Sequence, residues 1–295
     1  SRWPMLERSL ERTPERCVVE RRISVEHDRF MQQHLLNGIP VLPATFGCEM
    51  LAEGAELACP GFRVHRIENF HVDAPLGLPR SLPVTTKVVT RVVDKAQSGR
   101  VVLAEVRSAL PVKLKGAAGE RCHHAAQLAL ASSAPASLGT YDFPRRSEVL
   151  HATSIYARLT DPVCLGQLFA IARFIQLFGD QVVGIIDPPD LAAIFEGFSA
   201  PRFIVCPLVL DAALQIAGSW DGYRNGFVSV PVGIESVVFG RPPAPAEQTR
   251  AHARMTRIQN SDVYYDISIV GGNSELLAKL QDVHLKRIGN WADPR

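Results

Sequence analysis

Apolar and polar residues alternate over several stretches of the chain, and β-branched side chains are frequent in them. This pattern predicts strands that bury one face. In the first half the predicted strands cover residues 17–25, 62–72, 82–93, 100–110 and 123–132. In the second half they cover residues 181–187, 226–240, 250–260, 263–271 and 276–288.

Two other segments have the pattern of helices. Residues 45–58 read TFGCEMLAEGAELA, and residues 207–220 read PLVLDAALQIAGSW. Apolar and small residues occupy nearly the whole circumference of each helix, which predicts that both helices are largely buried.

Each half of the chain therefore combines one buried helix with several strands. Residues 133–146, between the halves, are rich in Ser, Ala and Pro and are predicted to form a linker. We expect an α+β fold with two domains, residues 1–132 and 147–295, in which two curled antiparallel sheets each wrap around a long central helix.

The composition of the chain excludes several classes of protein. Its 295 residues are 46% hydrophobic, and the formal net charge of +2 gives no argument for binding nucleic acid or an anionic membrane. No apolar run approaches the roughly 20 residues of a membrane span. Residues 1–16 contain neither an apolar signal core nor an initiator Met, so we expect a cytoplasmic chain that is processed or cut from a longer one.

The six cysteines are scattered, without a C-x-x-C pair. This spacing predicts neither a zinc site nor a disulfide framework, and it fits a reducing compartment. Cys122, His123 and His124 are neighbours, but such a cluster on a predicted strand is more often incidental than a metal site. We therefore expect no bound metal.

The segment HLLNGIPVLPA begins at His34 and precedes the first predicted helix. Gly38 allows a ligand to approach the backbone closely, and Pro43 suits the start of a helix. Ala44 and Thr45 then lie at a helix N-terminus, where free N–H groups can polarise a carbonyl. His34 is thus a candidate base beside an oxyanion site, although a structural loop with an incidental histidine is the commoner reason for so short a motif.

A second candidate, Asp211, lies within the apolar stretch LVLDAALQIA of the second predicted helix. Gln215 follows one turn later on the same helix face and can orient the carboxyl by a hydrogen bond. Burial raises a carboxyl pKa, and an acid that stays protonated near neutral pH can act as a general acid. The alternative role is a purely structural hydrogen bond. A histidine base and an aspartic acid together suit removal of an α-proton and protonation of a departing β-hydroxyl.

These residues resemble the motifs of the dehydratase domains of polyketide synthases, which have a double-hotdog fold. His34, Gly38 and Pro43 match the family's His-x-x-x-Gly-x-x-x-x-Pro motif, and Asp211 and Gln215 match its Asp-x-x-x-Gln motif. The resemblance covers nearly the whole chain. The segment PVLPATFGCEMLAEGAEL resembles the corresponding segment of iterative bacterial synthases of the enediyne or polyunsaturated-fatty-acid type.

The resemblance implies a role for each matched residue. His34 would take the C2 proton of a β-hydroxyacyl thioester, Asp211 would protonate the C3 hydroxyl, and Gln215 would orient Asp211. The positions implied to bind the thioester carbonyl or the substrate are Gly38, Pro43, Ala44 and Gly166. The substrate would arrive on the phosphopantetheine arm of an acyl carrier protein, with no cofactor bound to the domain itself. Other domains of a multidomain synthase and a second copy of the chain are the further partners implied, without nucleic acid or a membrane.

The sequence departs from the family at two places. Ala44 stands where the family usually has Gly. The segment Leu165-Gly166-Gln167-Leu168-Phe169 stands where the family has Tyr-Gly-Pro-x-Phe, so a Tyr hydroxyl is missing there. Tyr156 lies nearby in the sequence, but nothing in the sequence shows that it substitutes.

Glu49 is a rival acid, because it matches the acidic position of single-hotdog fatty-acid dehydratases. In a fused pair the helix that faces His34 is the second one, and this favours Asp211 by analogy. Two other functions stay open: a double-bond isomerase or cyclase on the same fold, and a degenerate double hotdog that serves as a structural or carrier-docking module. The intact pair of His34 and Asp211 favours an enzyme, whereas Leu165 and Gln167 favour the degenerate module.

Overall fold

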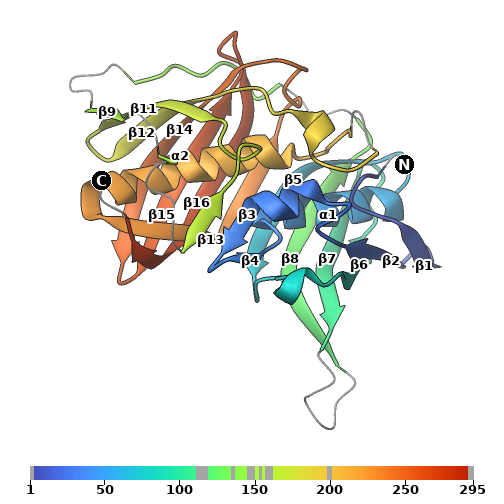
Figure 1. Ribbon diagram of the computed structural model, residues 1–295. Coiled ribbons are helices and arrows are strands. Elements are labelled where there is room, and N and C mark those ends of the chain that lie inside the picture. Colours follow the sequence, from blue (N-terminus) through green and yellow to red (C-terminus); the bar gives the residue numbers. More distant parts are fainter. Residues whose placement is uncertain are drawn as a thin grey trace.

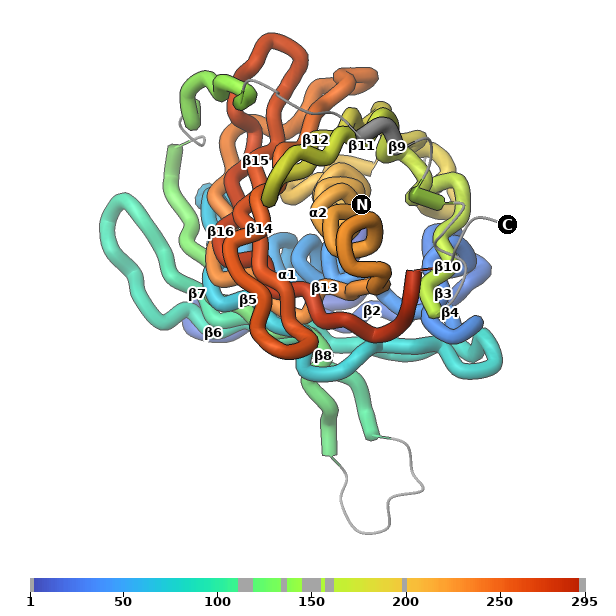
Figure 2. The backbone as a smooth tube through the Cα atoms, turned by 90° about the vertical axis from the view of Figure 1, so that its left-hand side faces the viewer, coloured from blue at the N-terminus to red at the C-terminus, as the bar shows by residue number. Residues whose placement is uncertain are grey.

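Two helices, α1 (Ala44–Ala58) and α2 (Pro207–Asn225), lie one after the other across a large antiparallel sheet (Figure 1). The computed structural model describes residues 3–110, 119–133, 137–144, 150–152, 155–156, 162–197 and 201–291. Within these residues the sheet has 13 strands, and it curls around the helices (Figure 2).

The strands follow one another across the sheet in two groups. From the first edge, the first half of the chain contributes β1 (Arg8–Arg12), β2 (Arg16–Ile23), β6 (Val84–Asp94), β7 (Gly99–Ala109), β8 (Glu120–Ala131) and β5 (Arg63–Val72). The second half continues with β13 (Phe227–Phe239), β16 (Leu276–Asn290), β15 (Asp262–Val270), β14 (Thr249–Gln259), β12 (Gln181–Ile186), β11 (Ala172–Phe178) and β9 (Leu150–Ala152). Antiparallel pairing of β5 with β13 joins the two groups edge to edge.

Each helix packs against the strands of its own half, and the two helices also contact each other. Both helices are mostly buried, as their apolar patterns predicted, because one face meets the sheet and the opposite face meets the other elements. Gly54 lets α1 approach β6 closely, since a Cβ at this position would lie 2.6 Å from the side chain of Val88. The buried apolar cluster contains residues of both halves.

The predicted helices and long strands are confirmed, with shifts of a few residues at their ends. The second helix runs on to Asn225, and Gly226 ends it with a φ of 76°. The division at residues 133–146 stays a prediction, and the described part of this segment pairs with the second half: Thr140 forms a β-bridge with Glu275, and the Tyr141 hydroxyl contacts His252. None of the described helices is long and apolar enough to cross a membrane.

A small second sheet brings the two halves of the chain together next to the first helix. Its strands are β3 (His34–Leu36), β4 (Ile39–Pro40) and β10 (Val163–Leu165), in the order β10-β3-β4. Asn37 and Gly38 link β3 to β4 with positive φ angles of 51° and 72°, the geometry of a two-residue hairpin turn. Leu165 of β10 pairs directly with His34 of β3.

In the part of the chain that the structure describes, the remaining elements are three short 3₁₀ helices, η1 (Arg29–Gln33), η2 (Pro79–Ser81) and η3 (Leu191–Ala193). Of these, η1 ends immediately before His34, so the start of β3 is held between a helical turn and a paired strand. These contacts fix the backbone that carries the candidate base.

Candidate active site

His34 lies at the start of β3, with its imidazole half-buried. Its Nδ1 is 2.9 Å from the carbonyl oxygen of Val41, so Nδ1 carries the hydrogen and donates it. The other ring nitrogen, Nε2, then has a lone pair that can accept a proton. The ring of Phe169 lies 5.3 Å from the imidazole and restricts its orientation.

Asp211 projects from α2 and is only 6% exposed. Gln215 Nε2 donates a hydrogen bond of 2.6 Å to its Oδ2. Burial raises the pKa of Asp211 above its ordinary value, while the neighbouring His34 and the bond from Gln215 oppose this rise. The candidate acid on the second helix is therefore a buried carboxyl whose pKa is shifted upward by its loss of contact with water.

One cavity of about 70 Å³ is lined by both candidate groups, with His34 reaching it from β3 and Asp211 and Gln215 reaching it from α2. The rest of the lining is mostly apolar: Val163, Leu165, Leu214, Gly218, Val228, Ser229, Val230, Pro231, Leu285 and Trp291. The candidate acid and the candidate base, from opposite halves of the chain, thus converge on one mostly apolar space, as acid–base chemistry would require.

Sequence reasoning did not assign a role to Tyr156. Its hydroxyl lies 2.8 Å from Gln215 Oε1, and Gln215 in turn bonds Asp211. The contact joins residues 59 positions apart and comes from an irregular segment, so neither periodicity nor motif spacing signalled it.

The start of α1 carries the predicted substrate-binding positions Pro43 and Ala44, which are not among the described residues that line the cavity of His34, so this role stays a prediction. Pro43 is the N-cap, and its carbonyl accepts hydrogen bonds from the amides of Phe46 and Gly47. The amides of Ala44 and Thr45 lie before the first hydrogen-bonded amide of the helix, so the helix itself supplies no acceptor for them.

Each of the two glycines predicted to contact substrate, Gly38 and Gly166, lies where the local structure itself favours glycine. Gly38 is exposed in the hairpin turn, where its positive φ favours glycine, and it does not line the cavity of His34. A Cβ on Gly166 would lie 2.8 Å from the side chain of Gln33. The backbone carbonyl of Gln33 accepts a hydrogen bond from the Gly166 amide. Gly166 thus holds β10 against the residue before His34, and substrate contacts of both glycines stay predictions.

Glu49, the rival acid, is fully buried on α1 but faces a different element. Its two carboxyl oxygens accept hydrogen bonds of 2.8 Å from the amides of Ile204 and Val205. Burial raises the pKa of Glu49 to about 7, against the lowering effect of these amides. Glu49 is not among the described residues that line the cavity of His34, and this geometry favours Asp211 as the acid.

The neighbours Cys122, His123 and His124 lie on β8 and do not converge. The two ring nitrogens of His123 contact the Ser108 hydroxyl and the Ala74 carbonyl, whereas His124 stacks on Phe70 inside the sheet. Within the described residues there is no group of three or more His, Cys, Asp or Glu side chains that could hold a metal ion. All six cysteines are free thiols.

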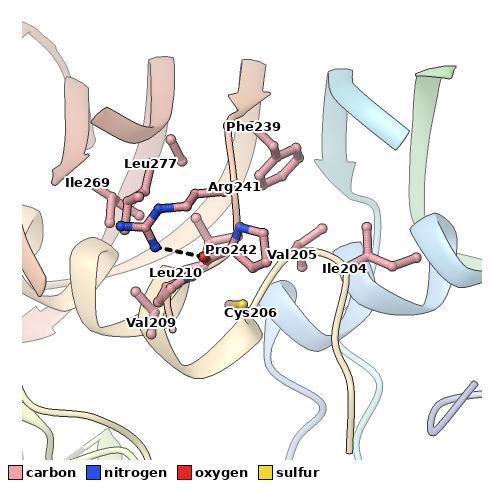
Figure 3. Close-up of a pocket in the computed structure, with 13 residues that line it drawn as sticks. Ile204, Val205, Cys206, Val209, Leu210, Phe239, Arg241, Pro242, Ile269 and Leu277 are labelled. Atoms are coloured by element: carbon pink, nitrogen blue, oxygen red, sulfur yellow. Dashed lines mark hydrogen bonds between the residues drawn. The ribbon is translucent and has the colours of Figure 1, made fainter. Parts of the chain in front are cut away.

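A second cavity, of about 30 Å³, lies at the start of α2 (Figure 3). Its walls are apolar except at Cys206 and at Arg241, whose guanidinium bonds the carbonyl of Pro242 and the carboxylate of Glu247. Neither His34 nor Asp211 lines it, so it is separate from the candidate acid–base site.

Solved structures with the same arrangement are dehydratase domains of polyketide synthases. The dehydratase domain from the CurF module of curacin polyketide synthase aligns with a TM-score of 0.77 and 16% identity, over 97% of this chain and 99% of that one. The dehydratase domain of RzxB from Pseudomonas fluorescens aligns with a TM-score of 0.70 and 17% identity, over 97% and 99% of the two chains. The fold is therefore the double hotdog, as the sequence predicted.

Two family models cover most of the sequence. Residues 142–295 match the model described as polyketide synthase dehydratase N-terminal domain, and residues 3–107 match the one described as polyketide synthase dehydratase domain. The chain belongs to the polyketide synthase dehydratase family. It is also 28% identical over 214 residues to the pikromycin polyketide synthase component PikAII of Streptomyces venezuelae, and this match covers 71% of the chain but only 5% of that relative.

Proposed function

We propose that this dehydratase domain, a lyase of polyketide biosynthesis, removes water from a β-hydroxyacyl thioester bound to an acyl carrier protein. The product is an α,β-unsaturated acyl thioester. The proposal rests chiefly on one observation: His34 and Asp211, from opposite halves of the chain, line the same apolar cavity.

In the proposed reaction His34 Nε2 removes the C2 proton of the substrate. The electron pair of the broken C–H bond forms the new C2–C3 double bond as the C3–O bond breaks, and Asp211 supplies the proton with which the hydroxyl leaves as water. The site then holds an imidazolium and a carboxylate, and transfer of one proton from His34 back to Asp211 restores it. The apolar walls strengthen the attraction between these two charges.

The thioester carbonyl must be polarised for the C2 proton to become acidic. The amides of the first turn of α1, at Ala44 and Thr45, are the donors that we propose for this role. Substitution of the family's usual Gly by Ala44 leaves this amide in place.

The acyl chain would reach the cavity on the phosphopantetheine arm of the carrier protein, without any cofactor bound to the domain. We further propose that the chain works in the cytoplasm beside other domains of a synthase, as a homodimer. Four arginines, Arg63, Arg66, Arg145 and Arg146, are candidates for attracting an acidic carrier protein. Arg63 is paired with Glu56 and Arg66 with Glu68. Arg145 and Arg146 lie outside the described residues.

The alternative functions fit the site less well. A double-bond isomerase or cyclase does not need a buried acid aimed at a leaving hydroxyl, yet Asp211 is buried and held by Gln215. A degenerate docking module needs neither group, and the convergence of both on one cavity favours catalysis.

The test is to incubate the purified chain with β-hydroxyacyl carrier-protein thioesters of several chain lengths and to follow the mass of the acyl group. Loss of the mass of one water supports the proposal. A product of unchanged mass with a shifted double bond would indicate an isomerase, and absence of any change with every chain length would contradict catalysis. The same acyl groups on a small-molecule thiol test whether the carrier protein is needed.

A further inference from the structure

The hydroxyl of Tyr156 contacts Gln215, which in turn contacts Asp211, and Tyr156 is not among the described residues that line the cavity. It accepts a hydrogen bond of 2.9 Å from the amide of Ala172. Its own hydrogen then points to an acceptor: Gln215 Oε1 lies at 2.8 Å and the carbonyl of Phe169 lies farther away, at 3.2 Å. Tyr156 is therefore a donor to Gln215.

One orientation of the Gln215 amide matches its surroundings better than the flipped one. Its Nε2 lies 2.6 Å from Asp211 Oδ2 and 3.3 Å from the carbonyl of Phe169, and both of these partners accept. Its Oε1 faces the Tyr156 hydroxyl, which donates. A flipped amide would set an oxygen against Phe169 and an NH₂ group against a hydroxyl that already accepts from Ala172.

The orientation of Gln215 decides which oxygen of Asp211 carries the acid proton. Because Gln215 donates to Oδ2, the proton of the neutral carboxyl resides on Oδ1. With the amide flipped, Oε1 would instead accept a proton from Oδ2 and hold it next to α2.

We propose that Tyr156 is a positioning residue for the dehydration, which fixes the Gln215 amide so that Asp211 presents its proton on Oδ1. This inference rests on the proposed function. It also gives a physical reason why an aliphatic Leu165 is tolerated opposite His34, since the orienting hydroxyl comes from another segment of the chain. The charged groups that act on Tyr156 are Asp211, Arg173 and Asp187, and His34 is the charged group that acts on Asp211.

The first test is Tyr156→Phe, which removes only the hydroxyl. We expect kcat to fall roughly 10- to 100-fold with KM little changed, the usual effect of releasing a group that orients a catalytic residue. Gln215 Oε1 would become free to accept from a protonated Asp211, so the pKa of the acid rises and the high-pH limb of the rate profile moves to higher pH. Tyr141→Phe is the matched control, because it removes a hydroxyl that bonds His252 away from this site.

A double-mutant cycle tests whether Tyr156 acts through Gln215. Gln215→Leu and the double variant Tyr156→Phe/Gln215→Leu are expected to have the same rate, since the hydroxyl has nothing left to orient. A wild-type rate in Tyr156→Phe, or a double variant slowed by the product of the two single effects, would overturn the proposal.

A titration of Asp211 separates this inference from the proposed function. The ¹³C chemical shift of the Asp211 carboxyl, followed against pH in folded wild-type and Tyr156→Phe protein, needs no turnover. A higher pKa in Tyr156→Phe supports the positioning role even if no substrate is dehydrated, and an unchanged pKa contradicts it even if the wild-type chain is active.

Discussion

The buried carboxyl of Glu49 offers a quantitative test, because its role can be separated from that of Asp211. Both of its carboxyl oxygens accept hydrogen bonds from backbone amides of the second half, and the carboxyl of its neighbour Glu53 accepts one from the amide of Met5. The perturbation is Glu49→Gln, which keeps the shape of the side chain and removes its titration.

The size of the expected change in the free energy of unfolding follows from the effect of burial on the pKa of Glu49. In the folded chain burial raises the pKa of Glu49 from 4.5 to about 7, so the folded state keeps a proton that the unfolded state releases between these pH values. Stability from this group is therefore fully present below pH 4.5 and is lost as the pH rises to about 7. At about 1.4 kcal/mol per pKa unit, the loss amounts to roughly 3 kcal/mol.

The assay is urea unfolding at a series of pH values from 4.5 to 8, with wild type and Glu49→Gln compared at each. The free energy of unfolding of wild type minus that of the variant is expected to fall across this range by an amount on the order of 3 kcal/mol, and the neighbouring Glu53 contributes to this fall because the charge of Glu49 raises its pKa. Glu26→Gln is the control: hydrogen bonds from its own backbone amide and from Ser24 lower the pKa of this exposed group, so its difference should not fall as the pH rises over the range.

Turnover is the second readout for the same variant. Glu49→Gln is expected to keep kcat within a few-fold of wild type, because Glu49 faces Ile204 and Val205 and not the cavity. A pH-independent stability difference would refute the reasoning about burial. A collapse of turnover at unchanged stability would show that Glu49, and not Asp211, is the acid.

Three glycine substitutions test the packing around the site. Gly38→Ala forces an alanine into a left-handed turn and is expected to lower the free energy of unfolding by about 1–2 kcal/mol, with turnover at low temperature preserved. Gly166→Ala sets a methyl group against Gln33 and is expected to lower the free energy of unfolding by about 1–3 kcal/mol. It should also reduce kcat, because β10 would shift beside His34. Equal kcat values in Gly38→Ala and Gly166→Ala would contradict this. Gly222→Ala would collide with the ring of Trp291, so a change in tryptophan fluorescence and a higher KM are expected, and unchanged fluorescence would contradict the packing.

The buried helices and long strands could be predicted because local pattern and tertiary environment agree. The helix at 45–58 is apolar nearly all round, and in the structure it is enclosed between the sheet and the other half. The candidate base and acid could also be found, since His34 and Asp211 belong to motifs with fixed spacing.

The short sheet beside the site could not be predicted in the same way. Its strand β10 has three residues, too few for a periodic pattern, and its pairing with β3 depends on contacts more than a hundred residues away in sequence. The Asn37-Gly38 pair was a usable signal for the hairpin, because both positions need positive φ. The Tyr156–Gln215 contact had no such signal, since it depends on where two distant segments meet.

The joining of β5 to β13 also lay beyond sequence reasoning. Alternation of apolar and polar residues identifies a strand but not the strand that pairs with it. β5 and β13 would show the same alternation if each lay at an open edge of its own sheet. This junction joins the half that carries the candidate base His34 to the half that carries the candidate acid Asp211.

We propose His34 and Asp211 as the acid–base pair of a dehydratase. The measurement that tests it most directly is the mass of the acyl group after incubation of a β-hydroxyacyl carrier-protein thioester with wild type, His34→Ala and Asp211→Asn. Wild type is expected to remove one water, and the two variants are expected to be slower by roughly 10²- to 10⁴-fold while melting like wild type. Dehydration by Asp211→Asn at the wild-type rate would contradict the claim.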